Sequence, residues 1–256
     1  MRRSTRATAI AAGTAAVAIL TATALTVSDQ ASQNQPRKPG IILAHGADRH
    51  PAQTATDWVT YADHVVEVTP VADRDIPPGQ DEIDRGEGLI LRNVTLRVDK
   101  VLWSSDTSAK TAPSSFEWTA HGWQFTDGST ANRTEMAGED EPRIETGHRY
   151  VMAIEWQEPK CDPGDGEIPG QWRGLGSESN IPYDNSVLGQ GEFQGQIQAS
   201  RTARAAAVGP EDPNYSLRDE FTGRTAEELT KRLNSTVPGQ QEQPAAAPNK
   251  HTRNCG

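Results

Sequence analysis

Few residues of this 256-residue chain have the types and spacing that would predict catalysis or metal binding. His45 and His50 lie five residues apart in a polar segment without a nearby third ligand, and a zinc site needs more ligands on a rigid frame. The acidic run Cys161–Glu167 lacks the ligand register of a calcium loop, so we interpret it as a polar turn. Glu139–Glu141 is interpreted as a solvated acidic turn. The sequence therefore predicts no metal and no other cofactor.

Signatures of nucleophilic and phosphate chemistry are also missing. The sequence contains no G-x-S-x-G, no H-E-x-x-H and no P-loop. Serine, histidine and aspartate all occur, but a catalytic triad is defined by geometry, which a sequence does not provide. No catalytic residue is therefore predicted, and whether the chain is an enzyme stays open.

Aromatic residues near carboxylates and amides are the best candidates for a binding surface. Trp172 lies in a glycine-rich stretch, Tyr183 and Asp184 follow it, and Glu192 comes after a Gly-Gln-Gly run. Exposed rings beside such polar groups are typical of sites for sugars or peptides. We therefore predict a ligand surface near Trp172–Glu192, with packing of these rings in the core or at its edge as the alternative. A second aromatic group surrounds a glycine in the same way: Trp118, His121 and Trp123.

The two cysteines, Cys161 and Cys255, are compatible with one disulfide bond. Cys161 follows an aromatic strand pattern, whereas Cys255 is the second-last residue of a polar tail that has little else to hold it. We predict that they pair. Two free thiols, exposed to oxidation outside the cell, are the alternative.

The first 27 residues predict export. Three arginines precede an uncharged stretch of Ala, Thr, Val, Ile and Leu at residues 7–27. This pattern is typical of a signal peptide with a small-residue cleavage site at Ala22–Ala24. The same 21 residues would form a helix of about 30 Å, long enough to stay as a membrane anchor. Both interpretations make the protein secreted or attached to the cell envelope, with membrane contact only through residues 7–27 if the leader is uncleaved.

The charge of the chain excludes one class of partner. Acidic residues outnumber basic ones by 35 to 25, and the net charge is −10. Such a surface repels phosphate backbones, so we expect no nucleic acid partner. Arginine far outnumbers lysine, and Ala, Gly, Pro and Thr are abundant, which indicates a high-GC bacterial genome. The expected partner is an unknown envelope or extracellular ligand.

Polar segments separate one domain from two ends. Residues 28–53 are predicted as linker, 54–234 as a β-rich domain, and 235–256 as a flexible tail. Strand patterns recur through the domain, with turn residues between them. The predicted strands are 64–71, 89–103, 116–125, 148–156 and 191–197.

Three local signals within these elements are specific. Pro70 predicts that its strand ends there or lies at an edge, because proline cannot donate to a ladder. The alternation of residues 89–103 changes phase after Asp99, which predicts a β-bulge near Lys100. Thr225 and Glu228 form a capping box that predicts a helix near 225–233, and residues 54–62 are compatible with another short helix.

Three strand patterns carry a resemblance to a known layout: Ala62–Val68, Val94–Leu102 and Thr146–Val151. They resemble strands of an uncharacterised family of exported proteins from high-GC Gram-positive bacteria, with an OB-like β-barrel. The resemblance covers roughly residues 58–233. The chain departs from the layout at Trp103, where a glycine often follows the preceding pair. The later segments that resemble this family are Trp172, Ile181–Asp184, Gly189–Glu192 and Gly223–Thr225.

The resemblance implies a fold and no activity. The expected fold is mainly β, a small OB-like barrel or sandwich with a short C-terminal helix. The expected function is that of an exported, non-enzymatic binding or interaction module with an unknown ligand. An envelope hydrolase with an unrecognised site and a module that inhibits proteases stay open as alternatives.

Overall fold

The computed structural model describes residues 40–46, 48–162 and 166–241. The predicted leader, residues 1–27, lies outside this part, and so does the tail from residue 242. The described chain is mainly β, and its helices are short. None of these described helices combines the length and apolar character needed to cross a bilayer.

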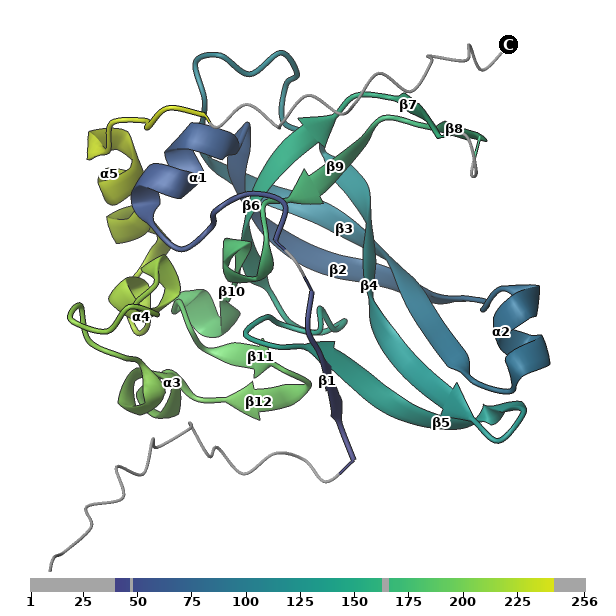
Figure 1. Ribbon diagram of the computed structural model, residues 1–256. Coiled ribbons are helices and arrows are strands. Elements are labelled where there is room, and N and C mark those ends of the chain that lie inside the picture. Colours follow the sequence, from purple (N-terminus) through teal and green to yellow (C-terminus); the bar gives the residue numbers. More distant parts are fainter. Residues whose placement is uncertain (1–39, 47, 163–165, 242–256) are drawn as a thin grey trace, which may run out of the picture. The chain divides into compact units, whose positions relative to one another are not determined.

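Eight strands form one open sheet (Figure 1). Its strand pairs are antiparallel except for the parallel pair of β1 and β5. The sheet is not closed into a barrel, so the predicted OB-like barrel is confirmed only as a mainly β fold. In spatial order the strands are β1 (Ile42–Ala44), β5 (Ser129–Gly138), β4 (Ser115–Thr126), β3 (Gly88–Ser104), β2 (His64–Ile76), β6 (Tyr150–Gln157) and β10 (Asn180–Pro182), and β9 (Gln171–Gly174) also pairs with β6.

Two small hairpins and several short helices complete the described chain. The hairpins are β7 (Lys160–Asp162) with β8 (Gly166–Ile168), and β11 (Gly191–Phe193) with β12 (Gln196–Gln198). The sequence indicates helices only at 54–62 and near 225–233, whereas these residues form five α-helices and two 3₁₀ helices. They are α1 (Ala55–Tyr61), α2 (Gln80–Arg85), α3 (Ser200–Ala206), α4 (Leu217–Phe221), α5 (Ala226–Ser235), η1 (Ser177–Ser179) and η2 (Asp184–Ser186).

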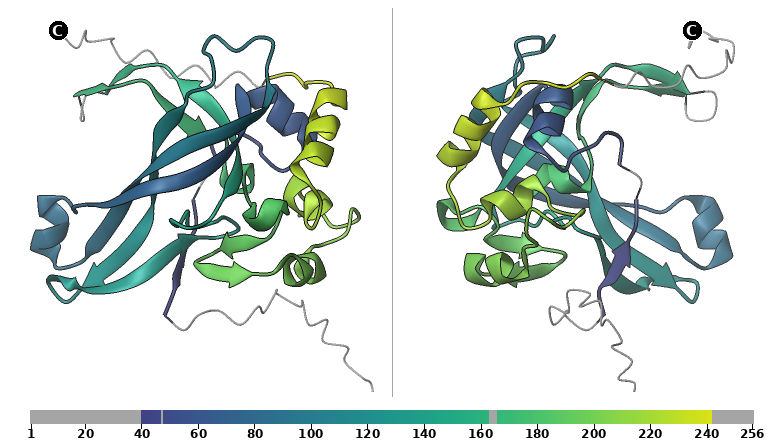
Figure 2. Two further views of the ribbon diagram at one scale, coloured as in Figure 1. Left: turned by 180° about the vertical axis from the view of Figure 1, so that it is seen from behind. Right: turned by 60° about the vertical axis from the view of Figure 1, so that its left-hand side comes forward.

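Strand β6 divides the core between the two faces of the sheet. Successive strand side chains point to opposite faces, so Val151 and Ala153 join one apolar cluster while Met152 and Ile154 join the other. Helices α1, α4 and α5 cover the first cluster, and α1 and α5 lie side by side there (Figure 2). Trp118, Trp156 and Trp172 belong to the second cluster, on the opposite face. The two faces therefore have different roles: one packs helices, and the other gathers indole rings.

Strands β2 and β3 confirm two local predictions. Val68 is opposite Val98, whereas Glu67 is opposite Lys100, so Asp99 is an extra residue and the bulge lies where the phase change predicts it. Only the first part of β2, up to Val68, pairs with β6. Pro70 therefore lies where β2 has become an edge strand, as its missing N–H requires.

The predicted C-terminal helix is confirmed as α5. The Thr225 hydroxyl accepts a hydrogen bond from the Glu228 backbone N–H, and the Glu228 carboxylate accepts one from the Thr225 N–H at 2.9 Å. Leu229 and Leu233 are buried against Trp58 of α1. The capping box thus starts the helix, and its apolar face attaches it to the sheet.

The domain extends further at both ends than the sequence predicts. Ile42–Ala44, predicted as linker, forms β1 and pairs with Met136–Gly138. Beyond α5 the backbone N–H of Gly239 donates to Thr60 Oγ1 at 2.7 Å, and the Gln241 amide donates to the Thr60 carbonyl at 2.7 Å. Residues on both sides of the predicted 54–234 boundaries therefore belong to the fold.

Candidate functional site

A cleft of about 560 Å³ opens on the indole-bearing face of the sheet. Most of its lining comes from four places: the end of β1 with residues 45–46 and 48–49, strand β4, the turn at 139–141 after β5, and β9 with the loop that follows it. The rest of the lining is Gln157, Lys160, Ile168 and Asn180. These places are far apart in the sequence, and only the fold brings them together. A volume of this size is typical of small-molecule sites.

Two indole rings form the apolar part of the lining. Trp172 of β9 is 8% exposed and packs edge-on against Trp156 of β6, with 5.4 Å between ring centroids. Trp118 of β4 is half-buried. A Cβ atom at Gly174 would lie 2.8 Å from the Trp118 ring and 2.9 Å from Ser179 Oγ. Glycine at this position therefore lets the Trp118 ring lie directly against β9.

A buried amide lines the same cleft without a partner for its oxygen. Asn180 opens β10, where its backbone is registered with Met152 of β6. Its side chain is 2% exposed, and Oδ1 makes no hydrogen bond with any described residue. Leaving a buried acceptor unpaired costs about 1–3 kcal/mol. Asn180 Oδ1 is therefore available to accept a hydrogen bond from a ligand.

The carboxylates of the lining already have partners. Glu141 Oε1 lies 2.9 Å from Nε2 of His121 on β4, and Glu139 contacts the His45 ring. The Asp48 carboxylate accepts a hydrogen bond from the Ser177 backbone N–H at 2.8 Å. These contacts join the walls of the cleft to one another. The fourth carboxylate of the lining, Asp140, is exposed, and its Oδ1 lies 3.9 Å from Arg218.

The cations of the lining are less fully paired. Arg49 Nε donates to Glu155 Oε1 at 2.6 Å. Arg173 lies opposite Glu155 in the β6–β9 register, yet it forms no ion pair with any residue of the described ranges. Burial lowers the pKa of the Arg173 guanidinium, and the charge of Arg49 lowers it further. No described carboxylate lies close enough to Arg173 to offset these two effects.

A β-bulge on β4 turns His121 toward the cleft. His121 and Gly122 together stand opposite the single residue Leu91 of β3. A Cβ atom at Gly122 would lie 2.1 Å from the Ile90 carbonyl oxygen, so only glycine permits this approach of the two strands. Bulges commonly redirect a side chain in this way.

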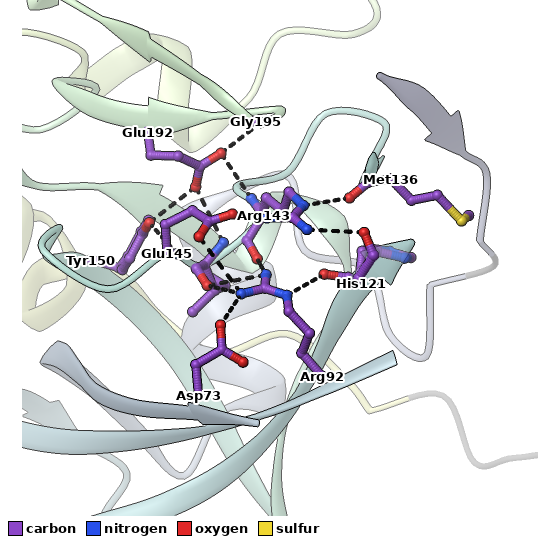
Figure 3. Close-up of polar contacts among 11 residues, drawn as sticks. Asp73, Arg92, His121, Met136, Arg143, Glu145, Tyr150, Glu192 and Gly195 are labelled. Atoms are coloured by element: carbon purple, nitrogen blue, oxygen red, sulfur yellow. Dashed lines mark hydrogen bonds and ion pairs between the residues drawn. The ribbon is translucent and has the colours of Figure 1, made fainter. Parts of the chain in front are cut away.

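Two buried arginines hold the backbone behind the cleft (Figure 3). Arg92, 1% exposed, donates to the His121 carbonyl at 2.7 Å, to the Arg143 carbonyl at 2.5 Å and to Asp73 at 2.6 Å. Arg143 donates to the carbonyls of Met136 at 2.8 Å and of Gly122 at 2.9 Å. Arg92 therefore binds carbonyls of β4 and of the turn that follows β5, and Arg143 binds carbonyls of β4 and β5.

Glu192 supplies the buried negative charge of this network (Figure 3). Its carboxylate accepts from the backbone N–H groups of Arg143 and Ile144, each at 3.1 Å, from Gly195 N–H at 2.7 Å and from the Tyr150 hydroxyl at 3.0 Å. Burial raises the pKa of Glu192, and the four donors oppose that effect. Burial and the Glu192 charge also raise the pKa of Tyr150.

The network supports the cleft from behind and does not line it. Glu192, Tyr150 and Arg92 are buried away from the lining, so a ligand in the cleft does not reach their ionisable atoms. What they fix is the position of His121 and of the turn at 139–141. The groups whose pKa burial raises are therefore placed for structure and not for proton transfer to a ligand.

The four predicted site residues do not form one exposed surface. Of them Trp172 lines the cleft, whereas Tyr183 is buried in the core cluster beneath the helices. Asp184 accepts from the Arg149 backbone N–H at 2.9 Å and lies 2.6 Å from His148 Nδ1, and Glu192 belongs to the buried network. The burial of Trp172 and Tyr183 agrees with the alternative interpretation, in which these rings pack in the core or at its edge.

The second aromatic group of the sequence contributes more to the cleft than expected. Trp118 and His121 both line it, although sequence reasoning gave them less weight than Trp172. Asn180 and Arg173 were not predicted at all. An isolated asparagine or arginine has no motif, and only the pairing of β6 with β9 and β10 brings these two residues together with the indoles.

The remaining predicted positions carry no further site. His50 Nε2 lies 3.2 Å from Glu155 Oε2, and its ring stacks on Tyr61. Within the described ranges no group of three or more His, Cys, Asp or Glu side chains could hold a metal ion. Cys161 is exposed in β7, whereas Cys255 lies outside the described residues, so the pairing of the two cysteines stays a prediction.

Comparison with known protein-family models, curated proteins and solved structures finds no match to this chain. The fold and the site together therefore describe this protein. It is a mainly β domain with one face of its sheet covered by helices and a cleft of aromatic and polar residues on the other.

Proposed function

We propose that this chain is an exported, non-enzymatic binding module whose ligand occupies the cleft between β4, β9 and residues 44–46 and 48–49. One observation carries the proposal: the Asn180 side chain is buried at the cleft with an unpartnered Oδ1. The indole rings of Trp118 and Trp172 offer apolar contact area beside it. Export is supported by the leader pattern of residues 1–27.

The composition of the lining favours a polyhydroxylated ligand such as a saccharide. Sugar hydroxyls donate and accept hydrogen bonds, and sugar rings present C–H faces that pack on indoles. The lining combines Trp118 and Trp172 with side-chain amides from Gln157, Gln171 and Asn180. A peptide ligand would use the same kinds of groups, so saccharides and peptides are both included in the test below.

The hydrolase alternative has less support. General acid–base catalysis needs a titrating group within hydrogen-bond reach of the substrate. The carboxyl and phenol groups whose pKa is raised all lie outside the lining of the cleft: Glu178, Glu192, Tyr150, Tyr183 and Tyr215. For the alternative of a protease inhibitor, the described residues offer no specific support.

The test is a ligand screen of the exported chain. Saccharides and peptides from a bacterial cell-wall extract are examined by ligand-observed NMR, and the protein is examined by tryptophan fluorescence. We expect binding that is lost in Trp118→Ala and weakened in Asn180→Ala. Trp123→Ala is the matched control, because Trp123 lies on the same strand but not in the lining. Binding that survives both Trp118→Ala and Asn180→Ala would place the ligand elsewhere and refute the proposal.

A further inference from the structure

We propose that the ligand of the cleft is an acidic saccharide, and that Arg173 binds its carboxylate. This inference rests on the proposed function and adds the charge of the ligand and the residue that recognises it. It starts from the charges of the lining, where three of the four carboxylates have close partners and the Arg173 guanidinium has no ion-pair partner among the described residues.

The β6–β9 register explains why Arg173 is left without an anion. Glu155 is the residue directly opposite Arg173, and a cross-strand pair of opposite charges would be the usual arrangement. The Glu155 carboxylate instead binds Arg49 through Oε1 at 2.6 Å and His50 through Oε2 at 3.2 Å. Both of its oxygens are therefore taken by the segment that follows β1.

The surroundings of Arg173 make an external anion favourable. The side chain is half-buried in the lining, next to the charge of Arg49, and both conditions lower the pKa of the Arg173 guanidinium. A bound carboxylate would offset the burial and the repulsion together, since charge-assisted pairs are strongest where water is excluded. A planar guanidinium also matches a carboxylate with two parallel hydrogen bonds.

The other charges of the cleft and of the chain favour a ligand with few negative charges over a long polyanion. Lys160 of the β7–β8 hairpin also lines the cleft and forms no ion pair with any other residue that the structure describes. The whole chain has a net charge of −10, which disfavours non-specific binding of long polyanions. Strand alternation places the Arg173 side chain on the face of β9 opposite to Trp172, so a carboxylate bound to Arg173 would lie at the edge of β9. The uncharged part of the saccharide would cross that edge to reach Trp118 and Asn180.

The experiment compares matched sugars on the exported chain. Glucuronic acid and glucose, and the corresponding acidic and neutral disaccharides, are titrated by ligand-observed NMR at low and moderate salt. We expect the acidic member of each pair to bind at least about tenfold more tightly, which corresponds to about 1.4 kcal/mol. Arg173→Gln should abolish the difference, and Arg173→Lys should keep part of it, because lysine retains the charge without the planar fork. Arg201→Gln is the control for net charge, since Arg201 is exposed on α3 and outside the lining.

The outcomes separate this inference from the proposed function. Equal binding of acidic and neutral sugars, lost in Trp118→Ala, would overturn the role of Arg173 and leave the binding module intact. A preference for acidic sugars that survives Arg173→Gln would also overturn it. If neither kind of sugar binds, the inference is wrong, and the wider screen with Trp118→Ala then decides whether the cleft binds any ligand.

Discussion

Ile144 has a backbone conformation that a β-branched residue rarely adopts, with φ at +61°. The surrounding hydrogen bonds hold it there from both sides. Glu192 binds its N–H, while Arg92 binds its carbonyl at 3.2–3.3 Å. Such strain persists only where the surroundings over-determine the conformation. The turn behind the cleft is therefore held by Glu192 and Arg92 and not by the preference of its own residues.

Replacing Glu192 tests this network. In Glu192→Gln one carboxylate oxygen becomes an NH₂ group, which cannot accept from the Ile144 N–H. We expect a loss of about 1–3 kcal/mol in the free energy of unfolding, measured by denaturant titration. Glu87→Gln is the control, because Glu87 is exposed and should change stability by less than about 0.5 kcal/mol. Equal stability of the two variants would contradict the structural role of Glu192.

The same variant should change the pH dependence of stability. Burial raises the pKa of Glu192 above its ordinary value of 4.5, so the native protein binds this proton more tightly than the unfolded chain. The stability that this carboxyl contributes is then present below about pH 4.5 and falls as pH rises through its raised pKa. Glu178 has the same direction of shift and adds to the fall. Unfolding curves across this range should show a weaker fall in Glu192→Gln than in the natural chain.

A second single-residue prediction concerns Gly122 on β4. A Cβ atom there would meet the Ile90 carbonyl at 2.1 Å, and backbone cannot move aside as a flexible side chain can. We expect Gly122→Ala to destabilise the protein by more than about 2 kcal/mol in denaturant unfolding. The control is Gly209→Ala, where a Cβ atom meets nothing within 4 Å. A Gly122→Ala protein as stable as the control would mean that the bulge on β4 is wrongly placed.

At the scale of elements, α5 provides a test of capping. Thr225→Ala removes the hydroxyl that accepts from the Glu228 N–H, and we expect a loss of about 1 kcal/mol in the free energy of unfolding. Thr230→Ala, in the middle of the same helix, replaces a poorer helix former with a better one and should be close to neutral. If both variants behaved alike in denaturant unfolding, the capping box would not be what starts this helix.

Elements defined by neighbouring residues were predictable from the sequence. The α5 helix depends on Thr225 and Glu228, three residues apart, and the bulge at Asp99 depends on the phase of one strand. Strand β1 was missed, because Ile42–Ala44 is a short apolar island that becomes a strand only through Met136–Gly138. Its pairing residues are far away in the sequence, and no local pattern records them.

In the cleft, too, some features follow from neighbouring residues and others only from contacts between distant ones. The aromatic groups around Trp118 and Trp172 were visible as compositional signals, but not which rings would be buried. The contact of Asp48 with Ser177 joins residues 129 positions apart. Arg173 is a candidate only because Glu155 binds two other partners. Properties that depend on which of several partners a side chain takes become visible only in the folded chain.

At the scale of the whole molecule, the predicted disulfide ties a tail residue to the β7–β8 hairpin. Bridging Cys161 and Cys255 closes a loop of about 95 residues and removes unfolded-state entropy worth about 4–5 kcal/mol in the chain-entropy model. We expect a linked peptide pair in the mass spectrum of a non-reduced tryptic digest of the natural chain. Cys161→Ser should leave Cys255 open to alkylation. Two alkylated cysteines in the untreated natural chain would contradict the bond.

Strand β1 also has a mechanical consequence. It is the first described strand from the N-terminal end, it is held by three registered residue pairs, and the residues directly after it form one wall of the cleft. A tensile force applied at residue 40 would load β1 before α1 and the helical face of the core, and would withdraw that wall as β1 peels away. A ligand bridging the wall to β4 and β9 would stabilise β1 against this opening by the same free energy with which the opening weakens the ligand's binding.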